Sequence, residues 1–438
     1  MGSKKEDQAF TIHGSVFRDK PGSVVLTRLL HSVLPLSVQR SFRDGAFRQV
    51  ADGGVAVTAG LAAVLRPRLA ARFLSVGRDR KDYRYGTHPR QVIEVVQPVT
   101  GFEGSGERAK LIVFVHGGAW GSGSTWMYRV MVDRLSQMGY TVASLGYRVY
   151  PDADTAGQLD DLAAAIRWIS DNLGLIGFDV TPELFLMGHS SGAHISLLYL
   201  IRRAKEDTGE DRRGAREESD RVGDGGELGQ LEVEGFIGLS GVYDVHRHYL
   251  YESWRRGGVH EISPMKAANG GVLHKLFHYS HPLLLAGKPR QPSHWSSRAT
   301  ARPHDSNPPN PPQAADILSQ ATEHTRASSS VGGVGVAAGA GRKLGRRLPR
   351  SLVVHGMADA TVPFSQTAAV AAALKALGVP TTVRFEPGGD HFGMVGQIMF
   401  TKESDVEVAL SQFTSAEAAQ RARQHREEGS SLDPRPRL

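Results

Sequence analysis

Residue types that could carry out nucleophilic chemistry occur in the order serine, aspartate, histidine along the chain. Ser190 lies at the centre of Gly188-His189-Ser190-Ser191-Gly192, between the apolar run 184–187 and the apolar stretch 193–201. This context predicts a strand, a sharp turn and a helix, with the hydroxyl exposed at the turn. A serine hydroxyl becomes a good nucleophile only when a neighbouring base takes its proton. Because the chain has 50 glycines among 438 residues, the pentapeptide could occur by chance, and its partners decide the interpretation.

The candidate acid and base lie downstream of the serine, each after a short apolar run. Asp359 follows residues 352–354, and His391 follows residues 382–385. Both positions fall at the carboxyl edge of a parallel sheet, where the functional side chains of α/β folds collect. We expect His391 to act as general base toward Ser190, and Asp359 to orient its imidazole. Asp390 is the alternative acid, although it shares a short loop with His391 and would not easily reach the far ring nitrogen.

A glycine-rich loop upstream of the serine could stabilise a developing negative charge. Gly117, Gly118 and Ala119 follow the apolar run 111–115, and small residues there let backbone N–H groups approach a ligand oxygen. We expect these residues, together with the N–H of Ser191, to form an oxyanion hole. We further expect a substrate pocket with side chains from four positions: Trp120, His189, His194 and Tyr243.

The elements that must position these residues follow an alternating pattern from residue 91 onward. Short apolar runs predict strands, and longer periodic stretches predict helices between most of them. The pattern indicates an α/β fold with a mostly parallel sheet and helices on both faces. The expected strands are 92–96, 111–115, 142–145, 184–187, 235–239, 352–354 and 382–385, and the expected helices are 126–138, 156–173, 193–201 and 367–377.

Composition divides the rest of the chain into an extension, insertions and a tail. We expect residues 1–84 to form a helical and partly disordered extension, and residues 85–421 to form the main domain. Within this domain we expect a charged surface insertion at 205–230, a lid at 243–285 and a low-complexity insertion at 288–349, rich in Pro, Ser, Gly and Ala. The polar tail 422–438 is expected to be disordered.

The absence of cysteine excludes disulfides, thiolate metal sites and a cysteine nucleophile. The histidines and carboxylates lack the spacing typical of metal ligands, so we expect neither metal nor cofactor. The net charge is +7, but most of the excess lies in segments that we expect to be unfolded, including Arg342-Lys343 and Arg346-Arg347. We therefore expect no nucleic-acid partner.

The N-terminal region leaves open a peripheral contact with a membrane. The uncharged window 53–65 is too short to cross a bilayer, and we expect neither secretion nor lipidation. Arg66, Arg68 and Arg72 follow the window, so it could form part of a basic amphipathic helix on a membrane surface. Packing against the protein's own body is the commoner role of such a segment. We expect a cytoplasmic protein, with membrane association as the alternative, and the sequence leaves its oligomeric state open.

The motifs His116-Gly117-Gly118-Ala119-Trp120, Gly188-His189-Ser190-Ser191-Gly192, the segment 355–363 and Gly389-Asp390-His391 occur in this order. With the pairs Tyr147-Arg148 and Asp160-Asp161, the chain resembles the esterase and lipase branch of the α/β-hydrolases. It is most similar to carboxylesterases grouped with isoprenylcysteine methylesterases and kynurenine formamidases. The resemblance covers about residues 85–287 and 348–413. Ser191 stands where this branch usually has alanine, which leaves the backbone donor intact.

The resemblance implies a serine hydrolase that cleaves a carboxylic ester through an acyl-enzyme, with Ser190, Asp359 and His391 as its triad. A small or hydrophobic ester is the expected substrate, and a prenylcysteine methyl ester is the sharpest single candidate. An arylformamidase acting on N-formylkynurenine would use the same triad. A catalytically silent hydrolase fold that serves as a binding protein is the alternative from another class, and the intact triad argues against it.

Overall fold

The structure is a computed structural model that describes most of the chain between residues 36 and 420. The described residues are 10–12, 15–17, 36–65, 68, 71, 73–75, 80–99, 108–208, 231–254, 260–281, 285, 343–415, 417–420 and 424. The expected tail 422–438, apart from residue 424, and most of the expected insertions 205–230 and 288–349 lie outside these residues.

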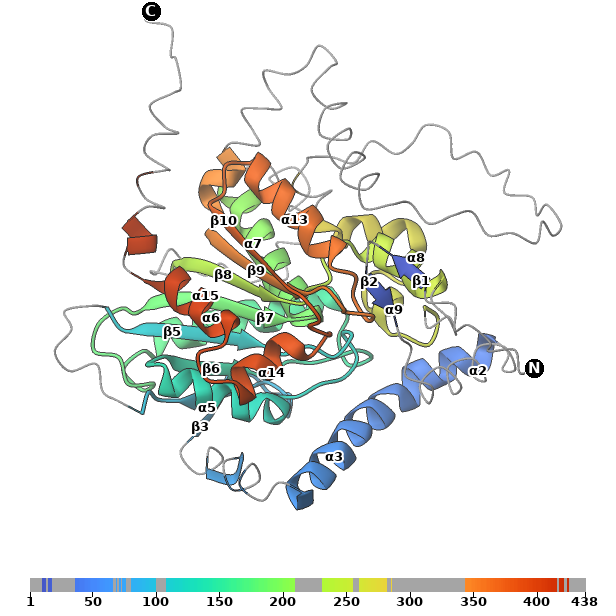
Figure 1. Cartoon of the computed structure of the whole chain (residues 1–438), viewed down its shortest axis with the longest axis horizontal. Helices are drawn as coiled ribbons and strands as arrows, with labels where there is room; N and C mark the ends of the chain where they lie inside the picture. The colour runs from blue at the N-terminus through green and yellow to red at the C-terminus, as the bar shows by residue number, and fades with distance from the viewer. Residues whose placement is uncertain are drawn as a thin grey trace, which may run out of the picture.

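An eight-stranded sheet forms the centre of the molecule, in the order β10-β9-β8-β7-β5-β6-β4-β3 (Figure 1). The six strands from β10 to β6 are parallel, whereas β4 pairs antiparallel with β6, and β3 pairs antiparallel with β4. The strands are β3 (Lys81–Arg84), β4 (Val92–Val96), β5 (Lys110–Val115), β6 (Thr141–Leu145), β7 (Glu183–His189), β8 (Val233–Leu239), β9 (Arg350–Gly356) and β10 (Thr381–Glu386).

Alternating side chains of β5 show why both faces of the sheet must be covered. Leu111, Val113 and Val115 belong to one buried cluster, and Ile112 and Phe114 belong to the other. Helices α6 (Thr155–Asp171), α7 (Ser191–Thr208) and α13 (Ser365–Ala376) contribute to the first cluster, and α5 (Arg129–Gln137), α14 (Gly393–Phe400) and α15 (Asp405–Thr414) contribute to the second (Figure 1). The expected α/β architecture is confirmed, because a strand that is apolar on both faces needs a layer on each side.

The structure differs from the sequence-based boundaries in three places. Strand β3 joins the sheet four residues before the expected start of the domain at residue 85; its exposed, polar residues carry no apolar pattern. Helix α7 continues to Thr208, into the expected surface insertion. Residues 343–347, expected to be unfolded, form a helical turn that buries Leu344 and leads to the buried Leu348. Pairing with β4 decides the first case, and burial of Leu344 and Leu348 decides the third.

Helices α2 (Leu36–Ser41) and α3 (Phe47–Leu65), joined by the π-helix η1 (Phe42–Ala46), precede the sheet. Among the described strands, β1 (Phe10–Ile12) and β2 (Ser15–Phe17) form a separate two-stranded sheet. Figure 1 shows α3 as a long helix at the edge of the molecule, beneath the lid helices. None of the described helices has the length and apolar character that a membrane crossing requires.

Among the described residues, the lid expected at 243–285 includes the short helices α8 (Val245–Trp254), α9 (Met265–Ala268) and η4 (Leu273–Tyr279), between β8 and β9. The hydroxyl of Tyr251 donates to the carbonyl oxygen of Ala360 at 2.6 Å, which links α8 to the loop after β9. Tyr249 donates to Glu261, and the ring of Phe277 stacks on that of His246. These lid aromatics therefore make contacts within the lid or with the body.

Candidate active site

Ser190 lies in the turn between β7 and α7, where the backbone reverses within one residue. Its φ is +54°, in the left-handed region, and its N–H donates to the carbonyl oxygen of Leu239 at 2.9 Å. Close packing allows no side chain at Gly192, since a Cβ there would clash with the carbonyl oxygen of Val115. The strained turn presents the Ser190 side chain at the carboxyl end of the sheet, 7% exposed.

His391 lies between β10 and α14 and contacts both Ser190 and Asp359. Its Nε2 is 3.0 Å from Ser190 Oγ, and its Nδ1 is 2.7 Å from Asp359 Oδ2. The consistent proton arrangement has Nδ1–H donating to the carboxylate while Nε2 accepts from the serine hydroxyl. In this arrangement the imidazole can take the serine proton, and the carboxylate can stabilise the imidazolium that forms.

Asp359 is held as a carboxylate by donors on both of its oxygens. Oδ1 accepts from the N–H groups of Thr361 and Val362, both at 2.8 Å, and Oδ2 also lies 3.1 Å from His355 Nε2. Burial alone would raise the pKa of Asp359, but the charge of His391 and the hydrogen bonds from both histidines outweigh it and lower this pKa well below its usual range.

Asp390, the alternative acid, makes a different contact. Its Oδ1 accepts from the N–H of Phe392 at 3.1 Å, within its own loop. The carboxylate that reaches the far nitrogen of His391 is therefore that of Asp359.

The glycine-rich loop after β5 bends through the left-handed region. Gly118, Ala119 and Trp120 have φ of +138°, +52° and +62°. Left-handed non-glycine residues cost on the order of 1–3 kcal/mol each, so the surroundings must hold this conformation in place. Within the described part of the chain, the N–H groups of Gly118 and Ala119 have no hydrogen-bond acceptor. Ser191 opens α7, so its N–H has no intrahelical partner either. These three N–H groups are therefore free to donate to a bound oxygen.

Gly117 does not fit the expected role of an oxyanion donor. Its N–H donates to the hydroxyl of Tyr128 at 3.2 Å, so it is already engaged. Tyr128, at the end of the 3₁₀-helix η2 (Thr125–Tyr128), was not singled out from the sequence. No local signal could have found it, because its role depends on a contact between two segments.

Tyr128 belongs to a buried chain of hydrogen bonds that joins the glycine-rich loop to the base. Its hydroxyl lies 2.9 Å from His189 Nδ1, and His189 Nε2 lies 3.0 Å from the carbonyl oxygen of His391. Burial lowers the pKa of His189 to about 3. A neutral His189 can accept from Tyr128 at Nδ1 and donate to His391 at Nε2, which fixes its tautomer.

The four residues expected to line the pocket are all buried, each 1% exposed or less: Trp120, His189, His194 and Tyr243. Trp120 Nε1 donates to His194 Nδ1 at 3.2 Å, and His194 Nε2 donates to the carbonyl oxygen of Tyr279 at 2.9 Å. Burial lowers the pKa of His194 to about 4, so it stays neutral near pH 7. The four side chains are thus packed inside the protein, and a role in lining the substrate pocket stays a prediction.

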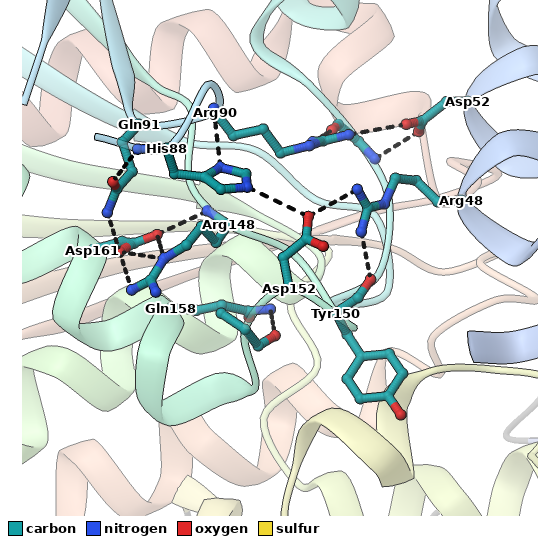
Figure 2. A network of polar contacts seen from close by, with 12 residues as sticks. Arg48, Asp52, His88, Arg90, Gln91, Arg148, Tyr150, Asp152, Gln158 and Asp161 are labelled. Carbon is teal, nitrogen blue, oxygen red and sulfur yellow. Dashed lines mark hydrogen bonds and ion pairs between the residues drawn. The ribbon is translucent and has the colours of Figure 1, made fainter. Parts of the chain in front are cut away.

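Asp161 holds the segment after β6 through contacts with two side chains. Arg148 donates to Asp161 through its backbone N–H and its guanidinium, at 2.6 to 3.0 Å (Figure 2). Gln91 donates to the same carboxylate at 2.7 Å.

Comparison with known proteins agrees with this geometry. The BD-FAE family model matches residues 102–259, and the model of the prolyl oligopeptidase family matches residues 330–409. The chain is 30% identical over 182 residues to a probable isoprenylcysteine alpha-carbonyl methylesterase of Arabidopsis thaliana, which covers 40% of this chain and 39% of that protein. It is 31% identical over 119 residues to a kynurenine formamidase of Drosophila melanogaster, covering 27% and 37% of the two chains. The matches thus span less than half the length of these relatives.

A solved structure extends the likeness beyond the matched sequence. Esterase B from Lactobacillus rhamnosus HN001 superposes with a TM-score of 0.51 at 17% identity, covering 86% of this chain and 99% of the other. At this identity the likeness concerns the fold. The sheet order, the serine at a strand–helix turn and these similarities show that the chain has the α/β-hydrolase fold, with isoprenylcysteine methylesterases and a kynurenine formamidase among its relatives in sequence.

Proposed function

We propose that the protein is a serine hydrolase that cleaves a carboxylic ester through an acyl-enzyme. The observation that carries this proposal is the pair of contacts made by His391, 3.0 Å to Ser190 Oγ and 2.7 Å to Asp359 Oδ2. A serine, a base and an orienting acid at these distances have the geometry that activates a hydroxyl nucleophile.

The reaction follows from this geometry. His391 takes the proton of Ser190, and Oγ attacks the ester carbonyl carbon to give a tetrahedral oxyanion. The N–H groups of Gly118, Ala119 and Ser191 stabilise this oxyanion. The imidazolium then gives its proton to the leaving alcohol, and the acyl-enzyme forms. Water, deprotonated by His391, attacks the acyl-enzyme, and the proton returns to Ser190 Oγ as the acid departs.

For the substrate we favour a small or hydrophobic ester, with a prenylcysteine methyl ester as the first candidate. The similarity to proteins named isoprenylcysteine methylesterases supports this choice. An arylformamidase acting on N-formylkynurenine is the second candidate, supported by the similarity to a kynurenine formamidase. Assays of farnesylcysteine methyl ester and N-formylkynurenine side by side would separate the two by kcat/KM.

Replacing the nucleophile tests the proposal itself. Ser190→Ala should lower the hydrolysis of p-nitrophenyl butyrate by about 10⁴-fold or more, because no nucleophile remains. It should also abolish labelling by a fluorophosphonate probe. Ser136→Ala is a matched control, since the hydroxyl of this buried serine bonds only within α5, to the carbonyl oxygen of Asp133. A Ser190→Ala protein that kept its activity would show that Ser190 is not the nucleophile. A wild type that neither hydrolysed the ester nor reacted with the probe would favour the silent binding protein.

The outer surface of α3 supports a peripheral membrane contact as part of the proposal. Val50, Val57 and Leu65 are 53%, 74% and 70% exposed and recur at helical spacing, and Arg66 and Arg68 follow them in sequence. Arg48, by contrast, binds the body through Asp152. Vesicles containing phosphatidylserine should co-sediment the wild type and release a Val50→Asp, Val57→Asp variant. Equal sedimentation of the two proteins would reject this contact.

A further inference from the structure

The glycine-rich loop needs external support, because four of its residues from 118 to 123 have positive φ and two of these are not glycine. Part of the support is internal, since the N–H groups of Gly121 and Ser122 both donate to the carbonyl oxygen of Gly118. The middle of the loop is held from the body. The carbonyl oxygen of Trp120 accepts from Gln158 Nε2 at 2.9 Å and from the N–H of Tyr150 at 2.8 Å.

The end of the loop, at Gly123, is held by two charged side chains from outside the catalytic segments. The N–H of Gly123 donates to Asp52 Oδ1 at 2.8 Å, and its carbonyl oxygen accepts from Arg90 at 2.8 Å. Arg90 and Asp52 also contact each other at 3.4 Å (Figure 2). The two side chains therefore bind both backbone polar groups of one residue and stabilise each other.

Asp52 reaches the loop because α3 is docked beside it. Arg48, one turn before Asp52, pairs with Asp152 at 2.9 Å and donates to the carbonyl oxygen of Tyr150 at 3.4 Å (Figure 2). The hydroxyl of Tyr150 donates to Asp44 at 2.9 Å. These contacts fix the inner face of the helical segment against the loop after β6.

We propose that Asp52 is a positioning residue for the oxyanion hole, an inference that rests on the proposed function. A carboxylate that accepts from Gly123 and pairs with Arg90 holds the end of the loop in its left-handed conformation. Without it, the Gly123 amide loses its acceptor, and Gly118 and Ala119 lose the constraint that fixes their N–H groups relative to Ser190. Helix α3 thereby contributes to transition-state stabilisation although it carries none of the reacting groups.

Oxyanion stabilisation can be measured separately from folding. Turnover of p-nitrophenyl butyrate should be divided by the concentration of active sites titrated with a fluorophosphonate. A smaller fraction of folded protein then does not lower the measured kcat. The affinity for an aryl trifluoromethyl ketone, which forms a tetrahedral oxyanion adduct with the serine, gives the second measurement. We expect Asp52→Ala to lower kcat per titrated site about 10-fold and to lower the affinity for the ketone by a similar factor. KM should be nearly unchanged, because displaced donors act mainly in the transition state.

Two further variants sharpen the test. Asp52→Asn keeps an acceptor for Gly123 but loses the charge beside Arg90. Its kcat per titrated site and its ketone affinity should therefore lie between those of wild type and Asp52→Ala. If the alanine variant does not fold, Asp52→Asn takes its place in the test. Asp44→Asn changes the same helical segment at a residue that does not contact the loop, and the amide oxygen still accepts from the Tyr150 hydroxyl, so this variant should match wild type in both measurements.

The inference fails if Asp52→Ala matches wild type in kcat per titrated site and in ketone affinity, even if its melting temperature falls. A wild type that neither hydrolyses esters nor reacts with the probe would instead remove the proposed function and the inference with it.

Discussion

The two halves of the candidate site are held by different parts of the chain. Ser190, Asp359 and His391 follow parallel strands of the sheet, and their mutual contacts arise from neighbouring core elements. The glycine-rich loop also follows a core strand, but its shape depends on groups from α3, α6 and the turn before β4. The sheet alone can therefore align a nucleophile, an acid and a base, whereas oxyanion donors in a left-handed loop require support from further elements.

The largest loss of activity is expected when the acid of the triad Ser190, Asp359 and His391 is replaced. Asp359→Asn removes the charge that stabilises the imidazolium, and we expect kcat for p-nitrophenyl butyrate to fall about 10³–10⁴-fold. Asp390→Asn, in the same loop as the base, should leave kcat within about twofold, because the Asp390 carboxylate accepts only from the N–H of Phe392 among the described residues. The reverse ranking of the two variants would overturn the assignment of the acid.

A single methyl group added to the glycine-rich loop should lower the activity. In Gly118→Ala, the new Cβ would clash with the carbonyl oxygen of Ser122 at a φ of +138°. We expect kcat per titrated site to fall about 10²-fold, comparable to the loss of one oxyanion donor. Gly378→Ala is a matched control, since Gly378 also has a positive φ but its added Cβ would meet nothing within 4 Å. If both variants kept full turnover, the loop would not be an oxyanion hole.

The chain of bonds through Tyr128 tests whether the two halves act together. Tyr128→Phe leaves the Gly117 N–H and His189 Nδ1 without a partner, and we expect kcat to fall about 10-fold with a loss of about 1–3 kcal/mol of stability. Tyr140→Phe removes a similarly buried hydroxyl that bonds Thr414, away from the site. It should cost comparable stability without lowering kcat per titrated site. Equal turnover losses in both variants would show that the effect of Tyr128 is not specific to the site.

The smallest expected effect is a pH dependence of stability due to His189. Burial lowers its pKa to about 3 in the folded protein, whereas the unfolded chain takes up a proton near pH 6.5. The unfolded state therefore binds more protons between these values, and the free energy of unfolding decreases as the pH falls from about 6.5 toward 3. In urea unfolding at pH 7 and pH 5, His189→Gln should lose less stability than wild type, by about 1–2 kcal/mol. An identical pH dependence would mean that His189 is not neutral in the folded protein.

Much of the fold was predictable because apolar strands and periodic helices leave clear local patterns. All seven expected strands are present in the sheet within a few residues of their expected limits. Strand β3 was missed because its side chains are polar and mostly exposed, so its pairing with β4 leaves no apolar pattern in the sequence. The turn at 343–347 was missed because its composition resembles that of the preceding low-complexity segment, while burial of Leu344 stabilises it.

By itself, the sequence determined which residues could react, since glycines around a serine and the order Ser190, Asp359, His391 are local or topological signals. Only the tertiary structure decided which groups hold them. It engaged Gly117 with Tyr128, buried the hydrogen-bonded side chains of Trp120 and His194, and brought Asp52 to Gly123 across 71 positions of sequence. Hydrogen bonds between distant segments depend on how helices and loops pack, and no spacing within one segment encodes that packing.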